Sequence, residues 1–171
     1  MGWLAGAMKM ADAAEQFLAQ RRIAVTGVSR NPGSHAANPV YQRLRKAGYE
    51  VFAVNPNTDE VEGDRAYPSL AAIDGGVDAV VIGTAPRHAM ATVQEAEQLG
   101  ITYVWMHRGP GDGSVSPEAT TWAREHGMTV LDGGCPLMFG RTSDFGHRFM
   151  CRMLTLTGSV PRTVGPEPDT E

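Results

Sequence analysis

Residues 23–45 read IAVTGVSRNPGSHAANPVYQRLR, and this stretch decides the fold. An apolar run at 23–25 ends at Gly27, a polar loop of small residues follows, and an apolar helical pattern then covers 40–44. This order of strand, turn and helix is typical of the first βα unit of a doubly wound α/β fold. Glycine lets the backbone approach an anion closely, and a helix N-terminus adds a partial positive charge. We therefore expect this loop to bind the phosphates of a nucleotide-containing cofactor.

Four further short apolar runs continue the pattern along the chain. They lie at 51–54, 79–82, 102–106 and 129–131, and helical patterns separate most of them. Strands that alternate with helices predict a parallel sheet with helices on both faces, so the fold class is α/β: a single-domain, Rossmann-like, doubly wound parallel sheet of about five strands. Between the second and third strands we expect an irregular connection with a short helical turn from Ser69. Ligands of such sheets bind at the carboxyl ends of the strands, which gives the loops 27–38, 55–57, 83–87, 107–115 and 132–140.

The chain divides into four predicted segments. Residues 1–22 form an N-terminal helical extension, 23–141 the Rossmann-like domain, 142–158 a C-terminal helix, and 159–171 a disordered tail rich in proline, threonine and acid. Apolar residues recur at helical spacing in the C-terminal helix. Such a helix either covers the sheet or forms a subunit contact.

Composition excludes several classes of function. The 171 residues carry a net charge of −4, so no basic surface favours nucleic acid. The two cysteines, Cys135 and Cys151, stand in no C-x-x-C spacing, and we predict neither a disulfide framework nor a metal site. We find no membrane span and no secretion signal, and expect a soluble cytoplasmic protein.

The first loop departs from the dinucleotide fingerprint G-x-G-x-x-G at two informative points. Ser29 occupies the place of the second glycine, and Asn55 stands where NAD sites usually carry an acid for the ribose hydroxyls. A neutral amide followed by Pro56 suits a cofactor without a free ribose diol, or one with an extra phosphate nearby. Arg30 offers a planar guanidinium to such a phosphate.

Four segments together resemble the small CoA-binding proteins, which are similar to the nucleotide-binding domain of the succinyl-CoA synthetase alpha subunit. They are G-V-S-R-N-P followed by Asn38, V-F-A-V-N-P-N, V-E-G-D-R-A-Y-P-S-L, and D-G-G-C-P-L-M. Each segment alone is unspecific, but their order and placement over residues 23–138 are characteristic. The resemblance implies that the chain binds coenzyme A.

The resemblance also implies a role for each matching position. The loop after the first strand would surround the CoA phosphates, the ends of the second and third strands would flank the adenosine and line the cleft, and the loop after the fifth would meet the pantetheine arm. The implied cofactor-binding residues are Gly27, Val28, Ser29, Arg30, Asn31, Asn38, Val54, Asn55, Pro56, Thr84, Ala85, Pro86, Arg87, Cys135 and Pro136. His35 lies in the same loop, where it either donates to a phosphate or is a solvated loop residue.

We predict no catalytic residues. The synthetase alpha subunit acts through a histidine of a second domain, for which this sequence shows no counterpart. His107 follows a strand at the ligand edge and stays a candidate, whereas His88, His126 and His147 suit helix ends or structural roles. The sequence places no base beside Cys135, so we interpret it as a small buried or half-buried residue; a mixed disulfide with the CoA thiol is a minor alternative. The acidic cluster at 59–64 fits a solvated surface rather than a metal loop.

We therefore expect a protein that binds CoA or an acyl-CoA without catalysis of its own. One alternative is an NAD(P)-binding oxidoreductase or redox sensor, because Arg30 could bind the extra phosphate of NADP. Another is an interaction module that has lost its ligand. Nucleic acid and membrane are not expected partners, and a homo-oligomer or a protein partner stays open.

Overall fold

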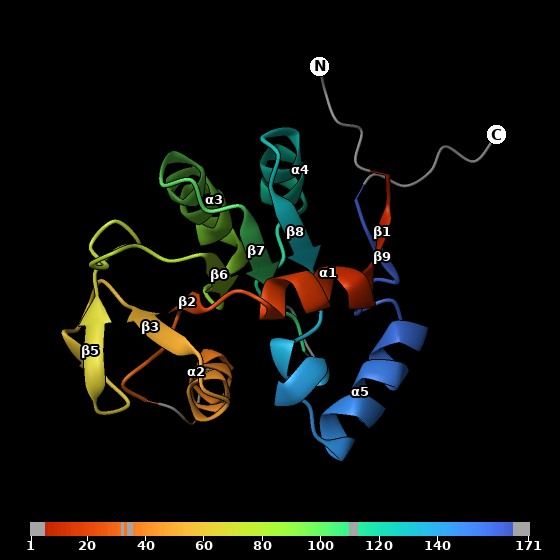
Figure 1. Cartoon of the computed structure of the whole chain (residues 1–171), viewed down its shortest axis with the longest axis horizontal. Helices are drawn as coiled ribbons and strands as arrows, with labels where there is room; N and C mark the ends of the chain where they lie inside the picture. Colours follow the sequence, from red (N-terminus) through yellow and green to blue (C-terminus); the bar gives the residue numbers. More distant parts are fainter. Residues whose placement is uncertain (1–5, 32, 34–35, 110–112, 166–171) are drawn as a thin grey trace.

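A seven-stranded, mostly parallel sheet with helices on both faces forms the centre of the molecule (Figure 1). This computed structural model describes residues 6–31, 33, 36–109 and 113–165. The strand order is β4-β5-β3-β2-β6-β7-β8. The strands are β2 (Arg22–Thr26), β3 (Glu50–Val54), β4 (Glu60–Val61), β5 (Asp64–Tyr67), β6 (Ala79–Ile82), β7 (Tyr103–Met106) and β8 (Thr129–Asp132). The helices are α1 (Met10–Leu18), α2 (Ala37–Lys46), α3 (Ala89–Gln98), α4 (Pro117–Glu125) and α5 (Phe145–Leu156). The doubly wound α/β prediction is confirmed, and its five strands are β2, β3, β6, β7 and β8.

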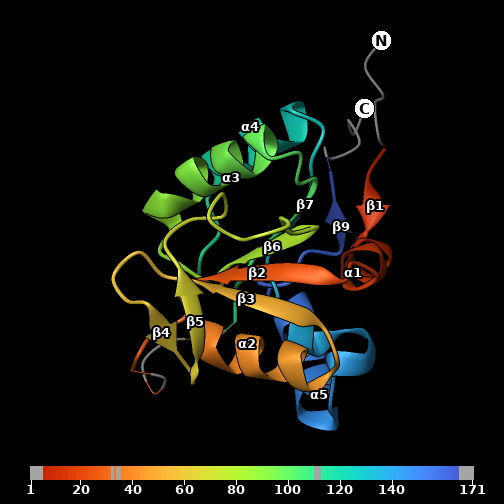
Figure 2. The same cartoon turned by 60° about the vertical axis from the view of Figure 1, so that its left-hand side comes forward.

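The central strand β2 fixes the two layers of the core. Its side chains alternate between the faces, so Ile23 and Val25 belong to one apolar cluster and Ala24 to the other. Helices α1, α2 and α5 pack on the first face, and α3 and α4 cover the second (Figure 2). The strand order reverses between β2, which continues to β3 on one side, and β6, which pairs with β2 on the other. Ligands of doubly wound sheets bind at such a reversal.

A short hairpin, β4–β5, replaces the irregular connection that we predicted after the second strand. The parallel pairing of β5 with β3 adds this hairpin to the sheet. Its turn, Glu62 and Gly63, has positive φ at both residues (53° and 77°), as a tight hairpin requires. Only Val61 and Ala66 are buried apolar residues of these strands, so charged neighbours hid the strand pattern. The expected helical turn from Ser69 is also wrong, because residues 68–75 form turns only.

The N-terminal helix is part of the core. Phe17 of α1 is fully buried and meets Trp105 of β7 edge to face, with ring centroids 5.2 Å apart. Next to α1, β1 (Met8–Lys9) pairs antiparallel with β9 (Thr163–Val164) (Figure 1).

The prediction of disorder from residue 159 is therefore wrong for residues 159–165. Val160 and Val164 are buried, and the backbone N–H of Met10 donates to the carbonyl of Arg162 at 2.9 Å. The polar composition of this segment hid its two buried valines. The partner strand of β9, β1, lies at the other end of the chain. Residues 166–171 lie outside the described part.

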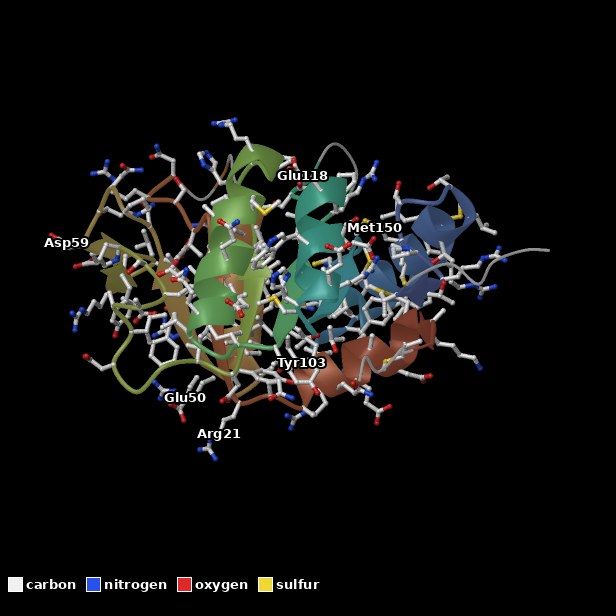
Figure 3. The ribbon with its side chains drawn as sticks, turned by 90° about the horizontal axis from the view of Figure 1, so that it is seen from above. Arg21, Glu50, Asp59, Tyr103, Glu118 and Met150 are labelled. Atoms are coloured by element: carbon white, nitrogen blue, oxygen red, sulfur yellow. The ribbon has the colours of Figure 1, made fainter. Side chains whose placement is uncertain are left out.

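The amino ends of the strands form a charged edge. The Arg22 Nη1 atom lies 2.7 Å from the Glu50 carboxylate, and the backbone N–H groups of Arg21 and Arg22 donate to Asp78. Arg21 and Glu50 lie together at one side of the molecule, and Glu118 at the start of α4 lies at the opposite side (Figure 3). The loops that we predicted to bind a ligand follow the carboxyl ends of the strands and lie at that opposite edge.

Within the described residues, no helix combines the length and apolarity needed to cross a bilayer.

Candidate functional site

Two glycines bring the loops after β2 and β6 into direct backbone contact at the strand-order reversal. Gly27 has φ +81°, and a Cβ there would lie 2.6 Å from the backbone C and O atoms of Gly83. A Cβ on Gly83 would lie 2.6 Å from the Cβ of Ala37 and from the carbonyl of Thr26. No other residue fits at either position without displacing backbone. The floor of the site is therefore bare backbone next to the start of α2.

Asn38 holds the loop after β2 in its shape. Its Oδ1 accepts the N–H of Ser29 at 2.9 Å, and its Nδ2 donates to the Ser29 carbonyl at 2.7 Å and to Glu62 at 2.6 Å. The Ser29 hydroxyl in turn accepts the N–H of Asn31 at 3.1 Å. The Asn38 side chain is completely buried. Asn38 thus lies beside the loop, as the sequence predicted, but faces the loop backbone and the hairpin.

Asn55 ties the end of β3 to the same loop. Its Nδ2 donates to the carbonyl of Val28 at 2.9 Å, and its Oδ1 accepts the N–H of Asn57 at 2.9 Å. An acid at this position could not donate to Val28. The residue that we singled out because it replaces the ribose-binding acid of NAD sites therefore has a structural task of its own.

A cleft of about 680 Å³ opens above this floor at the carboxyl edge. Its volume lies within the range of small-molecule sites. The loops after β2, β3 and β6 contribute ten of the predicted residues: Gly27, Ser29, Arg30, Asn31, Val54, Asn55, Pro56, Thr84, Ala85 and Arg87. Sequence reasoning missed a second group, from the loop after β5, the residue that precedes α3 and one face of α3, which comprises Pro68, Ser69, Leu70, His88, Ala91, Thr92 and Glu95. The helical spacing of 88, 91, 92 and 95 was the available signal.

The groups around the cleft favour a negatively charged ligand. Among the described residues, no side chain caps the N-terminus of α2 or of the 3₁₀ turn η2 (Pro86–His88), and neither element has an acid in its first turn. Arg30 and Arg87 are exposed at the rim, with no ion pair within the described residues. The one acid of the lining, Glu95, accepts the N–H of Ala71 at 3.0 Å. An anion with several oxygens fits this arrangement.

Thr84 marks a place for a polar ligand atom. Its hydroxyl oxygen is buried and has no hydrogen-bond partner among the described residues, although Thr84 lines the cleft. An unpaired buried hydroxyl costs free energy. A ligand that hydrogen-bonds at this point would remove that cost.

Family comparison agrees with this geometry. The model of the family described as CoA binding domain matches residues 21–141, which is more than half of the chain. The chain belongs to the CoA binding domain family. The matched segment contains β2 to β8 and every residue of the cleft lining.

Relatives of this member of the CoA binding domain family include one that the match covers almost completely and one that it covers only in part. The uncharacterized protein YneT of Bacillus subtilis is 31% identical over 125 residues, which cover 73% of this chain and 89% of YneT. The alpha subunit of an ADP-forming acetate–CoA ligase II of Pyrococcus furiosus is 28% identical over 128 residues, which cover 71% of this chain but only 28% of the subunit. A hypothetical protein of Pyrococcus horikoshii has a similar solved structure, with a TM-score of 0.69, 28% identity, and coverage of 80% of this chain and 93% of that one.

The remaining predicted residues of this CoA-binding domain lie away from the cleft lining. Cys135 is buried on the face covered by α1, α2 and α5, Pro136 is buried beside it, and neither residue is among the described residues that line the cleft. Burial raises the pKa of the Cys135 thiol to about 12, so the thiol is a poor nucleophile. Val28 is fully buried, and Pro86 is the first residue of η2. His35 lies outside the described residues.

Two of the other histidines have structural partners. His126 Nδ1 lies 2.8 Å from the Trp122 carbonyl, and His147 Nδ1 lies 2.9 Å from Asp144. His107 is buried, and burial lowers its pKa to about 4, so the side chain is neutral at pH 7. His107 is also absent from the described residues that line the cleft. His88 is exposed at the cleft wall.

The acidic cluster at 59–64 is less solvated than we predicted. Glu62 accepts from Asn38 and Gln42, and Asp64 accepts the hydroxyl of Tyr41 at 2.7 Å. Burial and this carboxylate raise the pKa of the Tyr41 hydroxyl. The hairpin therefore contacts α2 through these hydrogen bonds and, through Asn38, supports the loop after β2. No group of His, Cys, Asp or Glu among the described residues could hold a metal ion.

Proposed function

We propose that this domain binds CoA or an acyl-CoA in the cleft and performs no chemistry on it. The observation that carries the proposal is the side-chain-free junction of Gly27 and Gly83 beside the start of α2. Backbone N–H groups and the helix N-terminus would hold the pyrophosphate there. Arg30 and Arg87 at the rim would add charge-assisted hydrogen bonds to phosphate oxygens.

The adenosine end would lie at the ends of β3 and β5. Val54, Pro56 and Leu70 give this part of the cleft an apolar wall, which suits the face of a purine. The Asn55 amide is occupied by Val28 and Asn57, so it is not free to take the place of the acid that grips a ribose diol. This engagement favours CoA, whose adenosine ribose carries a 3′-phosphate, over NAD.

The proposed lack of catalysis rests on the groups around the cleft. Of its two titratable groups other than arginine, Glu95 is engaged with Ala71 and His88 has no nucleophile beside it among the described lining residues. A histidine or cysteine poised by a neighbouring base would be expected in an acyl- or phosphoryl-transfer site. Incubation with acetyl-CoA, ADP and phosphate should therefore release no free CoA thiol, and thiol release by the purified chain would overturn this part of the proposal.

Isothermal titration calorimetry with CoA, acetyl-CoA and NAD⁺ tests the binding directly. We expect CoA and acetyl-CoA to bind at one molecule per chain and NAD⁺ to bind far more weakly. Arg30→Glu should weaken CoA binding by about tenfold because it places a negative charge beside the phosphates. Lys46→Glu, which makes the same charge change at the far end of α2, should leave the affinity unchanged. Tight binding of NAD⁺ without CoA binding would refute the proposal and favour the oxidoreductase alternative.

A further inference from the structure

Helix α5 carries a row of large apolar side chains on its outer face. Phe145, Phe149, Met153 and Leu156 are 87%, 60%, 48% and 73% exposed. Their spacing of four, four and three residues places them on one side of the helix. We call this row the α5 stripe. Among the described residues, Leu99 is the one other exposed large apolar side chain, so the exposed apolar surface is concentrated on a single element.

Contacts at its start and on its inner side join α5 to the rest of the molecule. Asp144 caps α5 by accepting the N–H of His147 at 2.8 Å, and its other oxygen lies 2.6 Å from Arg43 Nη2. On the inner side of the helix, Met150 and Leu154 pack against the core. α5 lies at the outside of the molecule in both cartoon views (Figures 1 and 2). One side of α5 therefore packs on the molecule, and the stripe lies on the exposed side.

The area of the stripe is comparable to the largest apolar patch of a typical monomer, which is often a functional surface. With about 150–250 Å² for a fully exposed aromatic side chain and somewhat less for leucine and methionine, the four exposed fractions amount to roughly 500 Å² of apolar surface. Two such surfaces buried against each other would remove roughly 1,000 Å², which is the lower bound for a specific interface before the flanking residues are added. The area therefore suffices for a second copy of the same helix.

The polar residues of α5 match the composition of a protein interface. Residues 145–156 contain no Asp, Glu or Lys, and Arg148 and Arg152 flank the stripe along one side. Interfaces are enriched in Phe, Met and Arg and depleted in Lys, Glu and Asp. α5 also begins after residue 141, where the family match ends, and its residues are absent from the cleft lining. The stripe is thus independent of the ligand site.

We propose that the chain forms a two-fold symmetric dimer in which the α5 stripes of two copies pack against each other. The same patch then meets itself, as in most homodimers. Arg148 and Arg152 of both copies enter one interface, where their like charges repel. Salt screens this repulsion, so the dimer is stronger in high salt than in low salt. Each copy keeps an open cleft, so dimerisation and CoA binding are separate properties.

Sedimentation velocity of the purified chain tests this proposal. At roughly 100 µM and 0.5 M NaCl, well above the dissociation constant of an ordinary specific dimer, we expect a species of twice the 18.3 kDa chain mass. Phe149→Glu should be monomeric, with the dissociation constant raised at least about a hundredfold, because each copy loses a large apolar side chain and places a carboxylate in the apolar contact. Leu99→Glu introduces the same carboxylate at the other exposed large apolar side chain of the described residues and should stay dimeric.

Three results would overturn the proposal: a monomeric wild type under these conditions, a dimeric Phe149→Glu, or a dimer that dissociates as salt is added. The last would indicate charge-complementary association, as with an acidic partner helix. Circular dichroism shows whether each variant is folded. Leu156→Glu, at the exposed end of the helix, is the second variant if Phe149→Glu misfolds, and it should also be monomeric.

Discussion

Replacing Asn38 by alanine should loosen the loop that forms the floor of the cleft. Three hydrogen bonds of a completely buried side chain disappear, two to the backbone of Ser29 and one to Glu62. At about 1 kcal/mol for each bond, the free energy of unfolding should fall by about 3 kcal/mol. The half-buried Ser29 groups regain water, so the cost does not reach the full desolvation penalty.

Urea denaturation and CoA titration measure the two consequences. We expect Asn38→Ala to lower both the free energy of unfolding and the CoA affinity, because the loop no longer presents its N–H groups in a fixed direction. Gln42→Ala is the matched control, since Gln42 also donates to Glu62 but is exposed and does not touch Ser29. It should cost less than about 1 kcal/mol and leave the affinity intact.

A third variant, Asn38→Asp, tests the direction of the hydrogen bonds. The introduced carboxylate can accept from the Ser29 N–H but faces the Ser29 carbonyl and Glu62 as an unpaired acceptor. Its pKa is therefore raised in the folded state, so the variant loses stability as the pH rises through that pKa, and its deficit should be larger at pH 8 than at pH 5. Wild-type stability and CoA affinity in both Asn38 variants would refute the assigned role of Asn38.

Further predictions concern charge, pH and thiol chemistry. Arg87→Glu should weaken CoA binding by about tenfold, and the loss should shrink as ionic strength rises; calorimetry at two salt concentrations measures this. The pKa of His107 is lowered to about 4 from 6.5, so between these values the unfolded chain binds a proton that the folded chain does not. The free energy of unfolding should therefore fall as the pH drops from about 6.5 to about 4, by up to about 3 kcal/mol. His107→Gln should flatten this dependence in urea melts; an equally steep profile would refute the assignment. Cys135, with its pKa raised to about 12, should react with a thiol-specific alkylating reagent at pH 8 only after unfolding, as mass spectrometry would show; rapid modification of the folded chain would contradict its burial.

The sequence predicted the parallel part of the sheet well because its strands are continuous apolar runs. β2, β6 and β7 are buried on both faces, so Ile23, Val81 and Val104 stand among apolar neighbours that leave no ambiguity. The β4–β5 hairpin escaped prediction because its few buried residues alternate with charges that pair with α2. The β1–β9 ribbon escaped because each strand has two residues and the paired residues Met8 and Val164 lie 156 positions apart in the sequence.

The candidate site was predicted where it depends on backbone and only partly where it depends on side-chain direction. Gly27 and the residues after β2, β3 and β6 reach the cleft because parallel strands end at one edge. Asn38 and Asn55 could be placed near the loop, but a sequence does not show that their amides face inward. Cys135 follows β8 as expected, but its side chain is buried on the face of the sheet that α1, α2 and α5 cover. The helical spacing of residues 88, 91, 92 and 95 indicates a shared face, but the sequence does not show that this face turns toward the cleft, because that depends on how α3 packs.

A chemical-shift titration of the ¹⁵N-labelled chain with CoA tests the central claim most directly. We expect saturable shifts for the amides of residues 27–31 and 83–87 and for the start of α2, and no shift for Cys135 or for the α5 stripe. Saturable shifts that instead cluster around Cys135, or an unchanged spectrum at millimolar CoA, would contradict the assignment of this cleft as the CoA site.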